Sequence, residues 1–408
     1  MELLHPRCGA LDVHKDVVMA CARIQVREYA KHPTAEFSTT TSGLLALADW
    51  LEEHQCQHVA MEATGVYWKP VWHVLEGRFQ LLLVNPAHAR NVPGRKSDVN
   101  DAHWLADLLA HGLIRASFVP PQPIQELRDL TRTRKQLVRQ IARHTLRIQK
   151  TLEDANLKLT GVISNLLGTS GRAILKALIA GETDPERLLE HTTGQLKAPR
   201  ERLLEGLRGA VTDHHRFMLK LHLRQIDSLE SGIRQLERQM EKLLRPFRER
   251  VEQLVTIPGV SDTVAQVLIA EIGLDMTRFP TAGHLVSWAG LCPRMDESAG
   301  KRRSNRVRQG APWLKTTLVM AGWAAAGARD TYLRAQFQRL KTRRGPKKAV
   351  VAVAASILTA AFYILRDHVP YQDLGADYFD HRDRTSVVRR LRRRIEALGY
   401  RVELHHVA

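Results

Sequence analysis

Four acidic residues near the start of the chain, Asp12, Glu62, Asp98 and Asp101, stand where carboxylates can bind metal. Asp12 and Glu62 each end an apolar, β-prone run, and neighbouring strands would bring their side chains together. Asp98 and Asp101 are three residues apart in the first turn of a predicted helix, so they share one face. Converging carboxylates repel one another unless a divalent cation neutralises them, and Mg²⁺ prefers such oxygen ligands. We therefore expect two Mg²⁺ ions about 4 Å apart, an arrangement that supports in-line displacement at phosphorus.

Each of these residues also has an ordinary structural interpretation. Asp98 would make a good helix N-cap, Asp101 a favourable first-turn charge, and Asp12 a turn residue. The metal interpretation is favoured because all four acids lie at the ends of predicted strands or helices, and the order of these elements along the chain, described below, is that of one known type of fold.

A basic segment, MDESAGKRRSNRVRQG at residues 295–310, contains a candidate nucleophile, Ser298. It holds two glycines and no acidic residue after Glu297, so we expect a flexible, electropositive loop that attracts a phosphodiester. Ser304 is the competing serine within the loop, and serines in loops are common in any protein. The basic residues of the segment, which we expect to bind nucleic acid, are Lys301, Arg302, Arg303, Arg306 and Arg308.

The segment LVTIPGVSDTVAQVLIAEIG at residues 254–273 resembles a helix-hairpin-helix, with Gly259 in the turn. Backbone amides in such a turn can bind a DNA phosphate without reading sequence. An ordinary helical turn with a Pro-Gly break is the alternative.

The elements that must hold the four carboxylates alternate in a regular order within residues 1–120. The first two strands form a hairpin around His14-Lys15-Asp16, and the whole order is β-β-β-α-β-α-β-α. This is the order of a ribonuclease-H-like, RuvC-type mixed sheet, with carboxylates on the first and fourth strands and on a late helix. The predicted strands are 7–13, 17–26, 36–40, 58–63 and 79–84, and the predicted helices are 42–54, 66–77 and 98–111.

The remainder of the chain is predicted to be mainly helical, so the fold class is α/β plus α. Residues 121–250 form a helical coiled-coil region with a less regular insertion at 160–214, and a 3-4 apolar alternation runs from Leu219 to Leu243 with a gap at His222. These helices pack together as an arm or mediate self-association, and a plain intramolecular hairpin is the alternative. Residues 251–375 are a second globular unit, and 376–408 are a basic tail.

Charge is distributed unevenly along the 408 residues. The net charge is +18, but residues 1–110 hold 10 basic and 13 acidic residues, a net −3, which leaves +21 on the rest. This distribution favours nucleic acid as the partner of residues 111–408. The alternative is that basic helices only keep the protein soluble. No unbroken apolar run has the length of a membrane helix and no signal peptide is evident, so we expect a cytoplasmic protein. The four cysteines fit no zinc or disulfide pattern, and we expect reduced thiols.

Taken together, the motifs resemble the transposases of the insertion-sequence-110 type, also called DEDD transposases, which act as RNA-guided DNA recombinases. The resemblance covers nearly the whole chain. It rests on LDVHKD at 11–16, MEATGVYW at 61–68, NPAHARNVPGRKSDVNDAHWLADLL at 85–109, TIPGV at 256–260, FPTAGHLVSWAGLCPRMDESAGKRR at 279–303 and the segment 310–318.

The resemblance implies that the metal-binding tetrad falls on the four acids already chosen and the nucleophilic serine on Ser298. It implies a covalent phosphoserine intermediate, a structured guide RNA, and dimers or tetramers in which the carboxylate module of one protomer faces the serine module of another. One departure stands out: related loops often read Ser-Ser-Gly-Gly-Lys, whereas this chain reads Glu-Ser-Ala-Gly-Lys. Only Ser298 remains as the aligned serine.

Two other functions compete with this one. A metal-dependent nuclease or junction resolvase would use water in place of Ser298, and a non-catalytic nucleic-acid-binding protein would need neither metal nor carboxylates.

Overall fold

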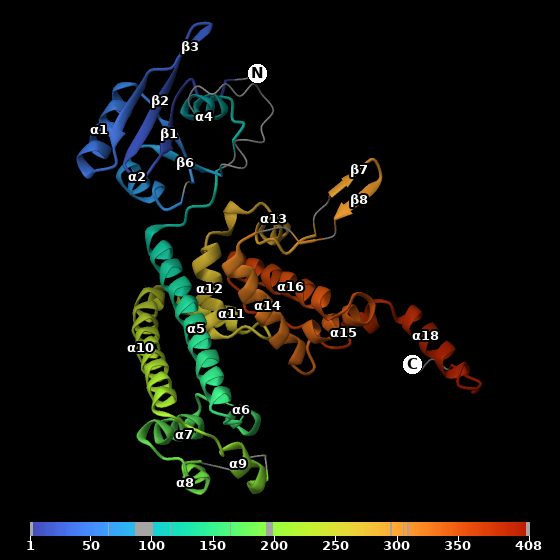
Figure 1. Ribbon diagram of the computed structural model, residues 1–408. Coiled ribbons are helices and arrows are strands. Elements are labelled where there is room, and N and C mark those ends of the chain that lie inside the picture. Colours follow the sequence, from blue (N-terminus) through green and yellow to red (C-terminus); the bar gives the residue numbers. More distant parts are fainter. Residues whose placement is uncertain are drawn as a thin grey trace. The chain divides into compact units, whose positions relative to one another are not determined.

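The structure is a computed structural model (Figure 1). Asp98 and Arg308 lie outside the described residues, and so do the side chains of Ser298, Arg302 and Arg303. The described residues are 3–63, 65–85, 101–114, 116–163, 165–192, 199–293, 296–304, 306–307 and 310–404.

Contacts within the chain divide it into two compact units, Met1–Val119 and Pro120–Ala408. The first is a mixed α/β unit and the second is almost entirely helical. Finer boundaries at residues 250 and 375 stay a prediction.

A mixed six-stranded sheet forms the centre of the first unit. Strand β1 (Arg7–Val13) pairs antiparallel with β2 (Val17–Val26) and parallel with β5 (His58–Glu62), and β5 pairs parallel with β6 (Gln80–Val84). On its other edge, β2 pairs with both β3 (Tyr29–Lys31) and β4 (Thr34–Ser38).

Helices cover both faces of this sheet. Alternate residues of a strand point to opposite faces, so Leu11 and Val13 of β1 pack on one side while Cys8 and Ala10 pack on the other. The first side is covered by α1 (Thr41–Glu53) and α2 (Trp68–Leu75), and the second by α4 (Asp101–Ala110). The unit is therefore a three-layer α/β/α sandwich.

The predicted strands and the observed ones differ at the sheet edge. The strand expected at 36–40 lies at Thr34–Ser38, and β3 was not predicted. Pro33 separates β3 from β4, while the ten-residue β2 is long enough to pair with both. Glu62 consequently ends the fifth strand along the chain, not the fourth.

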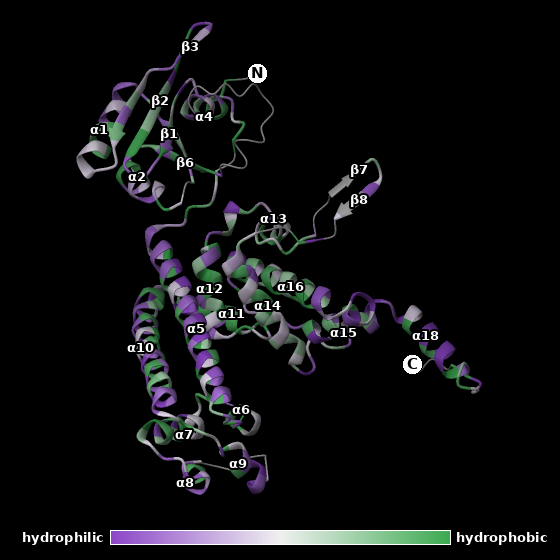
Figure 2. Ribbon diagram, in the orientation of Figure 1, coloured by the Kyte–Doolittle hydropathy of each residue, from purple (hydrophilic) through white to green (hydrophobic). Residues whose placement is uncertain are grey.

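Two long helices, α5 (Gln122–Asp154) and α10 (Asp213–Leu244), lie side by side in the second unit (Figures 1 and 2). They are antiparallel, because contacts join Arg134 to Glu237 and, farther along, His144 to His222. Their seam buries Leu219, Ile226 and Met240 but only half-buries Leu229, Ile233, Leu236 and Leu243. The helices thus form an intramolecular hairpin, and self-association through them stays a prediction.

The insertion between these helices is more regular than the sequence suggests. It contains four short helices whose leucines pack onto the base of the hairpin around Ile148, Leu152 and Ile226. They are α6 (Leu159–Val162), α7 (Thr169–Ala180), α8 (Pro185–Glu190) and α9 (Arg200–Gly206).

The second half of the helical unit has its own core, and α16 (Pro346–Asp367) runs through it with Val353, Ile357 and Leu358 buried. By length and composition α16 could cross a membrane, and the sequence did not predict this because Ser356 and Thr359 interrupt its apolar run. A core helix passes the same test, and 56% of the apolar window is buried. Around it are η1 (Arg245–Phe247), α11 (Arg248–Val255), α12 (Asp262–Ile272), η2 (Met276–Arg278), α13 (Ala282–Trp288), α14 (Pro312–Gly327) and α15 (Tyr332–Arg344).

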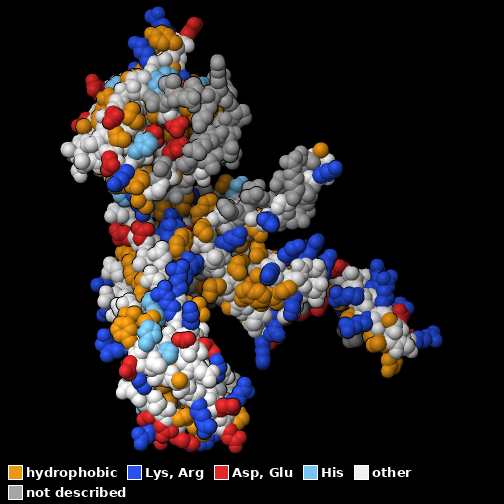
Figure 3. All heavy atoms as spheres, in the orientation of Figure 1, with side chains coloured by type: hydrophobic (Ala, Val, Ile, Leu, Met, Phe, Trp, Pro, Cys, Tyr) orange, Lys and Arg blue, Asp and Glu red, His pale blue; other side chains and the backbone are white. Residues whose placement is uncertain are grey.

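The basic tail contains the short helix α17 (Tyr378–Arg382) and the exposed helix α18 (Arg384–Glu396). Lys and Arg side chains dominate the visible face of α15 and α18 in Figure 3.

Candidate active site

Glu62 ends β5, and Asp12 is the last residue but one of β1, its parallel neighbour. Leu11 and Met61 form the last residue pair between β1 and β5, and Asp12 and Glu62 follow them directly in sequence. Both residues have the strand parity of Ala10 and Ala60, which pack in the α4 layer. Their side chains therefore point to the same face of the sheet from adjacent backbone positions. The strand register therefore places the two residues on adjacent strands, as the sequence predicted, and a shared metal site stays a prediction.

The amino end of α4 points toward the same edge. The backbone amides of Leu4 and His5 donate to the Ala110 carbonyl at 2.9 and 3.1 Å, so the carboxyl end of α4 lies beside the beginning of β1. Helix α4 consequently runs antiparallel to β1, and its first residue, Asp101, lies toward the strand end that carries Asp12. Asp101 is exposed.

The described residues contain no cluster of three or more His, Cys, Asp or Glu arranged to hold a metal. Asp12 has a side chain 24% exposed and lies 3.2 Å from His14 Nε2, a neighbour that the sequence interpretation treated only as part of a turn. Two carboxylates on one face are a fitting donor set for a hard cation. The predicted tetrad also includes Asp98, which lies outside the residues that the structure describes.

Helix α4 is fixed on the sheet by a further acid, Asp107, which is not one of the predicted tetrad. Its Oδ1 accepts from Arg23 Nε at 2.8 Å and lies 3.1 Å from His32 Nε2. Arg23 is 6% exposed, whereas the Asp107 side chain is 42% exposed, so only the arginine side of this ion pair is shielded from water. Asp107 therefore acts as an anchor for the helix that begins with Asp101.

Ser298 lies at the end of a β-hairpin formed by β7 (Asp296–Ser298) and β8 (Lys301–Ser304). The expected irregular loop is therefore a two-stranded hairpin. Ser298 pairs with Lys301 across a two-residue turn, Ala299-Gly300, whose φ angles of 50° and 72° match a type I′ turn. The turn residues Gly-Gly of related loops would adopt these angles more easily than Ala-Gly does.

The base of this hairpin is fixed to the helical core. Pro293 and Val307 form an antiparallel bridge, and a Cβ on Gly310 would lie 2.5 Å from the backbone of Ala289 and of Gly290. Gly310 thus holds the chain close to the end of α13 before α14 begins.

Lys301, which pairs with Ser298 across the turn, and Arg306, which follows Ser304, have exposed side chains, and phosphate binding by them stays a prediction. The competing serine, Ser304, accepts a hydrogen bond from the Arg306 amide at 3.2 Å. Its hydroxyl oxygen is therefore already engaged in a hydrogen bond with the backbone.

Comparison with known families covers both modules. A family model described as Transposase, for DEDD transposases of the IS110 type, matches residues 9–156. A second, described as Transposase IS116/IS110/IS902 family, matches residues 251–338. The chain belongs to the IS110 family of transposases.

Relatives extend this assignment over most of the transposase. Proteins named pilin gene-inverting protein, from Moraxella bovis and Moraxella lacunata, are each 24% identical over 380 residues, which cover 88% of this chain and 96% of theirs. The insertion element IS110 uncharacterized 43.6 kDa protein of Streptomyces coelicolor is 32% identical over 121 residues, 29% of each chain. The chain is accordingly a transposase that cleaves and rejoins DNA.

The turn between α11 and α12 of the transposase is packed tightly on α14. Gly259 has φ 86°, and a Cβ there would lie 2.5 Å from the Ala321 carbonyl oxygen and the Ala325 amide nitrogen. This close approach by itself requires glycine. Phosphate binding by the turn stays a prediction, and a substitution at Gly259 could not test it because any side chain would disturb the packing.

A cluster of polar contacts joins α5 to the start of α14, which follows the serine hairpin in the transposase sequence. Lys135 Nζ donates to the Trp313 carbonyl oxygen and to Thr317 Oγ1, each at 3.1 Å, and also to the Thr316 hydroxyl. Arg139 lies over the Trp313 ring at 5.3 Å. Burial and the charge of Arg139 lower the pKa of Lys135.

Beside it, Glu271 of α12 is 1% exposed and binds two arginines of α5. Arg132 donates two hydrogen bonds of 2.8 Å to its carboxylate, and Arg128 donates to the Ala270 and Glu271 carbonyl oxygens. Burial lowers the pKa of Arg128, and the Glu271 carboxylate opposes that shift. These buried pairs fix α5 on the helical core.

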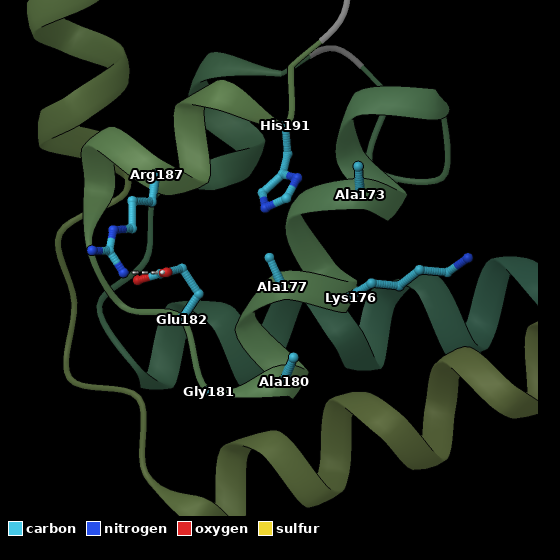
Figure 4. A pocket seen from close by; sticks show the side chains of 8 residues that line it. All are labelled: Ala173, Lys176, Ala177, Ala180, Gly181, Glu182, Arg187 and His191. Carbon is cyan, nitrogen blue, oxygen red and sulfur yellow. Dashed lines mark ion pairs between the residues drawn. The ribbon is translucent and has the colours of Figure 1, made fainter.

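The insertion holds an open hollow of about 790 Å³ between α7 and α8 (Figure 4). In the close-up Arg187 and Glu182 point toward each other, as a 3.6 Å ion pair, and His191 points into the hollow. Alanines form much of the remaining lining. None of the site residues predicted from the sequence lines this hollow.

The four cysteines of the transposase are free thiols. Burial raises the pKa of Cys8 and Cys21 to about 12 and that of Cys56 to about 11, so these groups remain protonated at neutral pH. A nucleophilic role for them is disfavoured.

Proposed function

We propose that this transposase cuts and rejoins DNA through a covalent link between Ser298 and a DNA phosphate. The observation that carries the proposal is the family match, which covers the carboxylate edge with Asp12 and Glu62 and, separately, the basic hairpin with Ser298. In the step proposed, the Ser298 Oγ–P bond forms and the bond from phosphorus to one deoxyribose oxygen breaks. The serine proton leaves with that oxygen, and rejoining reverses the exchange on another strand.

Asp12 and Glu62 would hold Mg²⁺, together with Asp98 and Asp101 as the resemblance implies. When bound, Mg²⁺ ions neutralise charge on the phosphate under attack. The chain's own contribution is to present two oxygen ligands from rigid strand ends and to keep α4 in place through Asp107. Lys301 and Arg306, with Arg302, Arg303 and Arg308, would attract the phosphodiester to the hairpin.

Rejoining, not cutting alone, is supported by the full-length relatives. Inversion of a gene, which the name of the Moraxella proteins describes, requires that cut ends be joined again. A covalent phosphoserine would conserve the phosphodiester bond energy for that second step. This favours the serine mechanism over a nuclease that uses water.

The resemblance further supports RNA guidance and a homo-oligomer. The exposed basic residues of the α5–α10 hairpin suit contacts to RNA or to a second copy (Figure 3). We also propose that the first unit is RNase-H-like, that the hairpin acts as a coiled-coil arm, that α11 and α12 act as a helix-hairpin-helix, and that the protein works in the cytoplasm at the nucleoid.

The test combines the full chain with Mg²⁺, DNA carrying the element and its flanks, and RNA transcribed from those flanks. Wild-type protein is expected to leave a protein–DNA adduct that survives denaturation, and Ser298→Ala is expected to abolish it. Ser304→Ala is the matched control and should retain the adduct. Asp12→Ala and Glu62→Ala should lower strand transfer at least about 100-fold, whereas Asp16→Asn, in the neighbouring turn, should not.

A wild-type rate of cleavage and rejoining in Ser298→Ala would overturn the covalent mechanism. Full activity of Asp12→Ala without Mg²⁺ would instead point to a non-catalytic nucleic-acid-binding role for this edge.

A further inference from the structure

Helices α15 and α16 meet at a corner that is strongly basic. Residues 331–366 contain eight Lys and Arg and no acidic residue. Five of these residues, called the basic corner below, lie where the two helices meet: Lys341, Arg343, Arg344, Lys347 and Lys348. All five are exposed, and none forms an ion pair within the described residues.

The placement of these charges is unfavourable for the isolated protein. Cations in the last turn of α15 complement the helix dipole, but Lys347 and Lys348 occupy the first turn of α16, where the dipole disfavours positive charge. The five cations also repel one another, because residues 331–366 contain no carboxylate. Of the five, only Arg343 lines a hollow together with carboxylates, those of Asp380 and Asp383. A polyanion bound at the corner would remove both costs.

An exposed apolar stripe on α14 adjoins the basic corner. Met320 is 69% exposed and Trp323 is 47% exposed, although Trp323 also contacts Phe337 of α15 with ring centroids 5.6 Å apart. Helix α14 crosses α16 here, since a Cβ on Gly322 would lie 3.0 Å from the Val350 carbonyl oxygen. Val350 lies within one helical turn of Lys347. In Figure 3 hydrophobic side chains gather over α14 with Lys and Arg side chains beside them.

We propose that Trp323, Met320 and the basic corner form a binding surface for an unpaired nucleotide strand. The cations would follow its phosphates, and a base would stack on the Trp323 ring. An exposed aromatic ring beside cations is the combination that binds single strands without reading sequence, whereas the bases of a duplex are already stacked on one another and cannot reach a surface ring. The inference rests on the assignment of the chain as a DNA transposase but not on the identity of its nucleophile.

The test measures binding of the full chain in EDTA, so that loss of strand transfer cannot affect it. The probes are fluorescent oligothymidylate and oligouridylate of about 20 nucleotides and a duplex of equal length. Trp323→Ala should weaken single-strand binding about 5- to 140-fold, the range for loss of one stacked base, and leave duplex binding within about 2-fold. The single strand that loses more affinity identifies DNA or RNA as the occupant.

Two conservative variants separate stacking from folding. Trp323→Phe keeps an aromatic face and should bind within about 3-fold of wild type, whereas Trp323→Leu keeps apolar bulk against Phe337 and should bind as weakly as Trp323→Ala. Wild-type single-strand affinity in Trp323→Leu would overturn the stacking surface. So would an equal loss for duplex and single strand, or a self-association that Trp323→Leu abolishes while single-strand binding is unchanged.

The basic corner is tested by the double change Lys347→Gln and Lys348→Gln. It should weaken single-strand binding. It should also make the negative slope of log affinity against log salt shallower, by about 0.7 for each phosphate that the variant no longer neutralises. The matched control, Arg27→Gln with Lys31→Gln, removes two exposed cations from the first unit and should change neither quantity. An unchanged slope in the α16 variant would overturn the role of the corner.

Discussion

Glu271, at 1% exposed, is the most deeply buried polar side chain among the described residues of the second unit. Its carboxylate accepts two hydrogen bonds from Arg132 and lies 3.9 Å from Arg128, so removing its charge would leave the mostly buried Arg128 and the partly exposed Arg132 without this counter-ion. Breaking one side of a buried ion pair costs about 3–5 kcal/mol, whereas exposed pairs contribute about 0–1 kcal/mol.

We therefore predict that Glu271→Gln markedly lowers the melting temperature of the helical unit in calorimetry. The matched control is Glu237→Gln, which breaks the exposed pair to Arg134 and should shift that transition by little. Equal shifts in the two variants would show that Glu271 is not the anchor of α5.

At the scale of elements, the α5–α10 hairpin contains a pH-sensitive contact. His144 and His222 lie with Nδ1 atoms 3.2 Å apart, and burial, followed by neighbouring positive charge, lowers the pKa of both. Arg147 faces the same pair. A histidine with a lowered folded pKa binds its proton more readily when unfolded, so stability is present above the unfolded pKa of about 6.5 and is lost as pH falls below it.

Replacing His222 by Leu would fill the gap in the apolar alternation of α10 and remove one of these groups. We predict that wild-type protein melts at a temperature several degrees lower at acid pH than at neutral pH, and that His222→Leu reduces this difference. His214→Gln, an exposed neighbour on the same helix, is the control and should keep the wild-type pH dependence. A pH dependence that persists unchanged in His222→Leu would contradict the role of the pair.

Local sequence patterns predicted the elements whose signals lie within their own segment. They missed the elements that depend on pairing with another segment. Strands 7–13 and 17–26 were predicted at their observed bounds because alternation and a polar turn are local signals. The hairpin at Asp296–Ser304 was interpreted as a loop because its polar strands carry no alternation, and β3 was missed because only pairing with β2 defines it.

The same distinction holds within the candidate site. Asp12 and Glu62 were predicted to be neighbours because both end apolar strands, whereas Asp107 and Glu271 gain their roles from arginines 84 and 139 residues away in sequence. No spacing rule connects residues across such separations.

At the scale of the whole molecule, the carboxylates and the serine belong to two separate compact units. Such a division permits an active site composed of the carboxylate edge of one protomer and the serine hairpin of another, as the resemblance implies. Symmetric dimers of this kind would contain two composite sites, each with one contribution from each subunit.

We predict that mixing Asp12→Ala with Ser298→Ala protein restores strand transfer that neither variant supports alone. In a mixed dimer one composite site combines the intact carboxylates of one subunit with the intact serine of the other, while the second site is doubly defective. Random pairing would restore about a quarter of the wild-type sites. The measurement is strand transfer after the two proteins are unfolded and refolded together, with each variant refolded alone as the control. Absence of any recovery, although mixed dimers form, would place carboxylates and serine of one site in the same protomer.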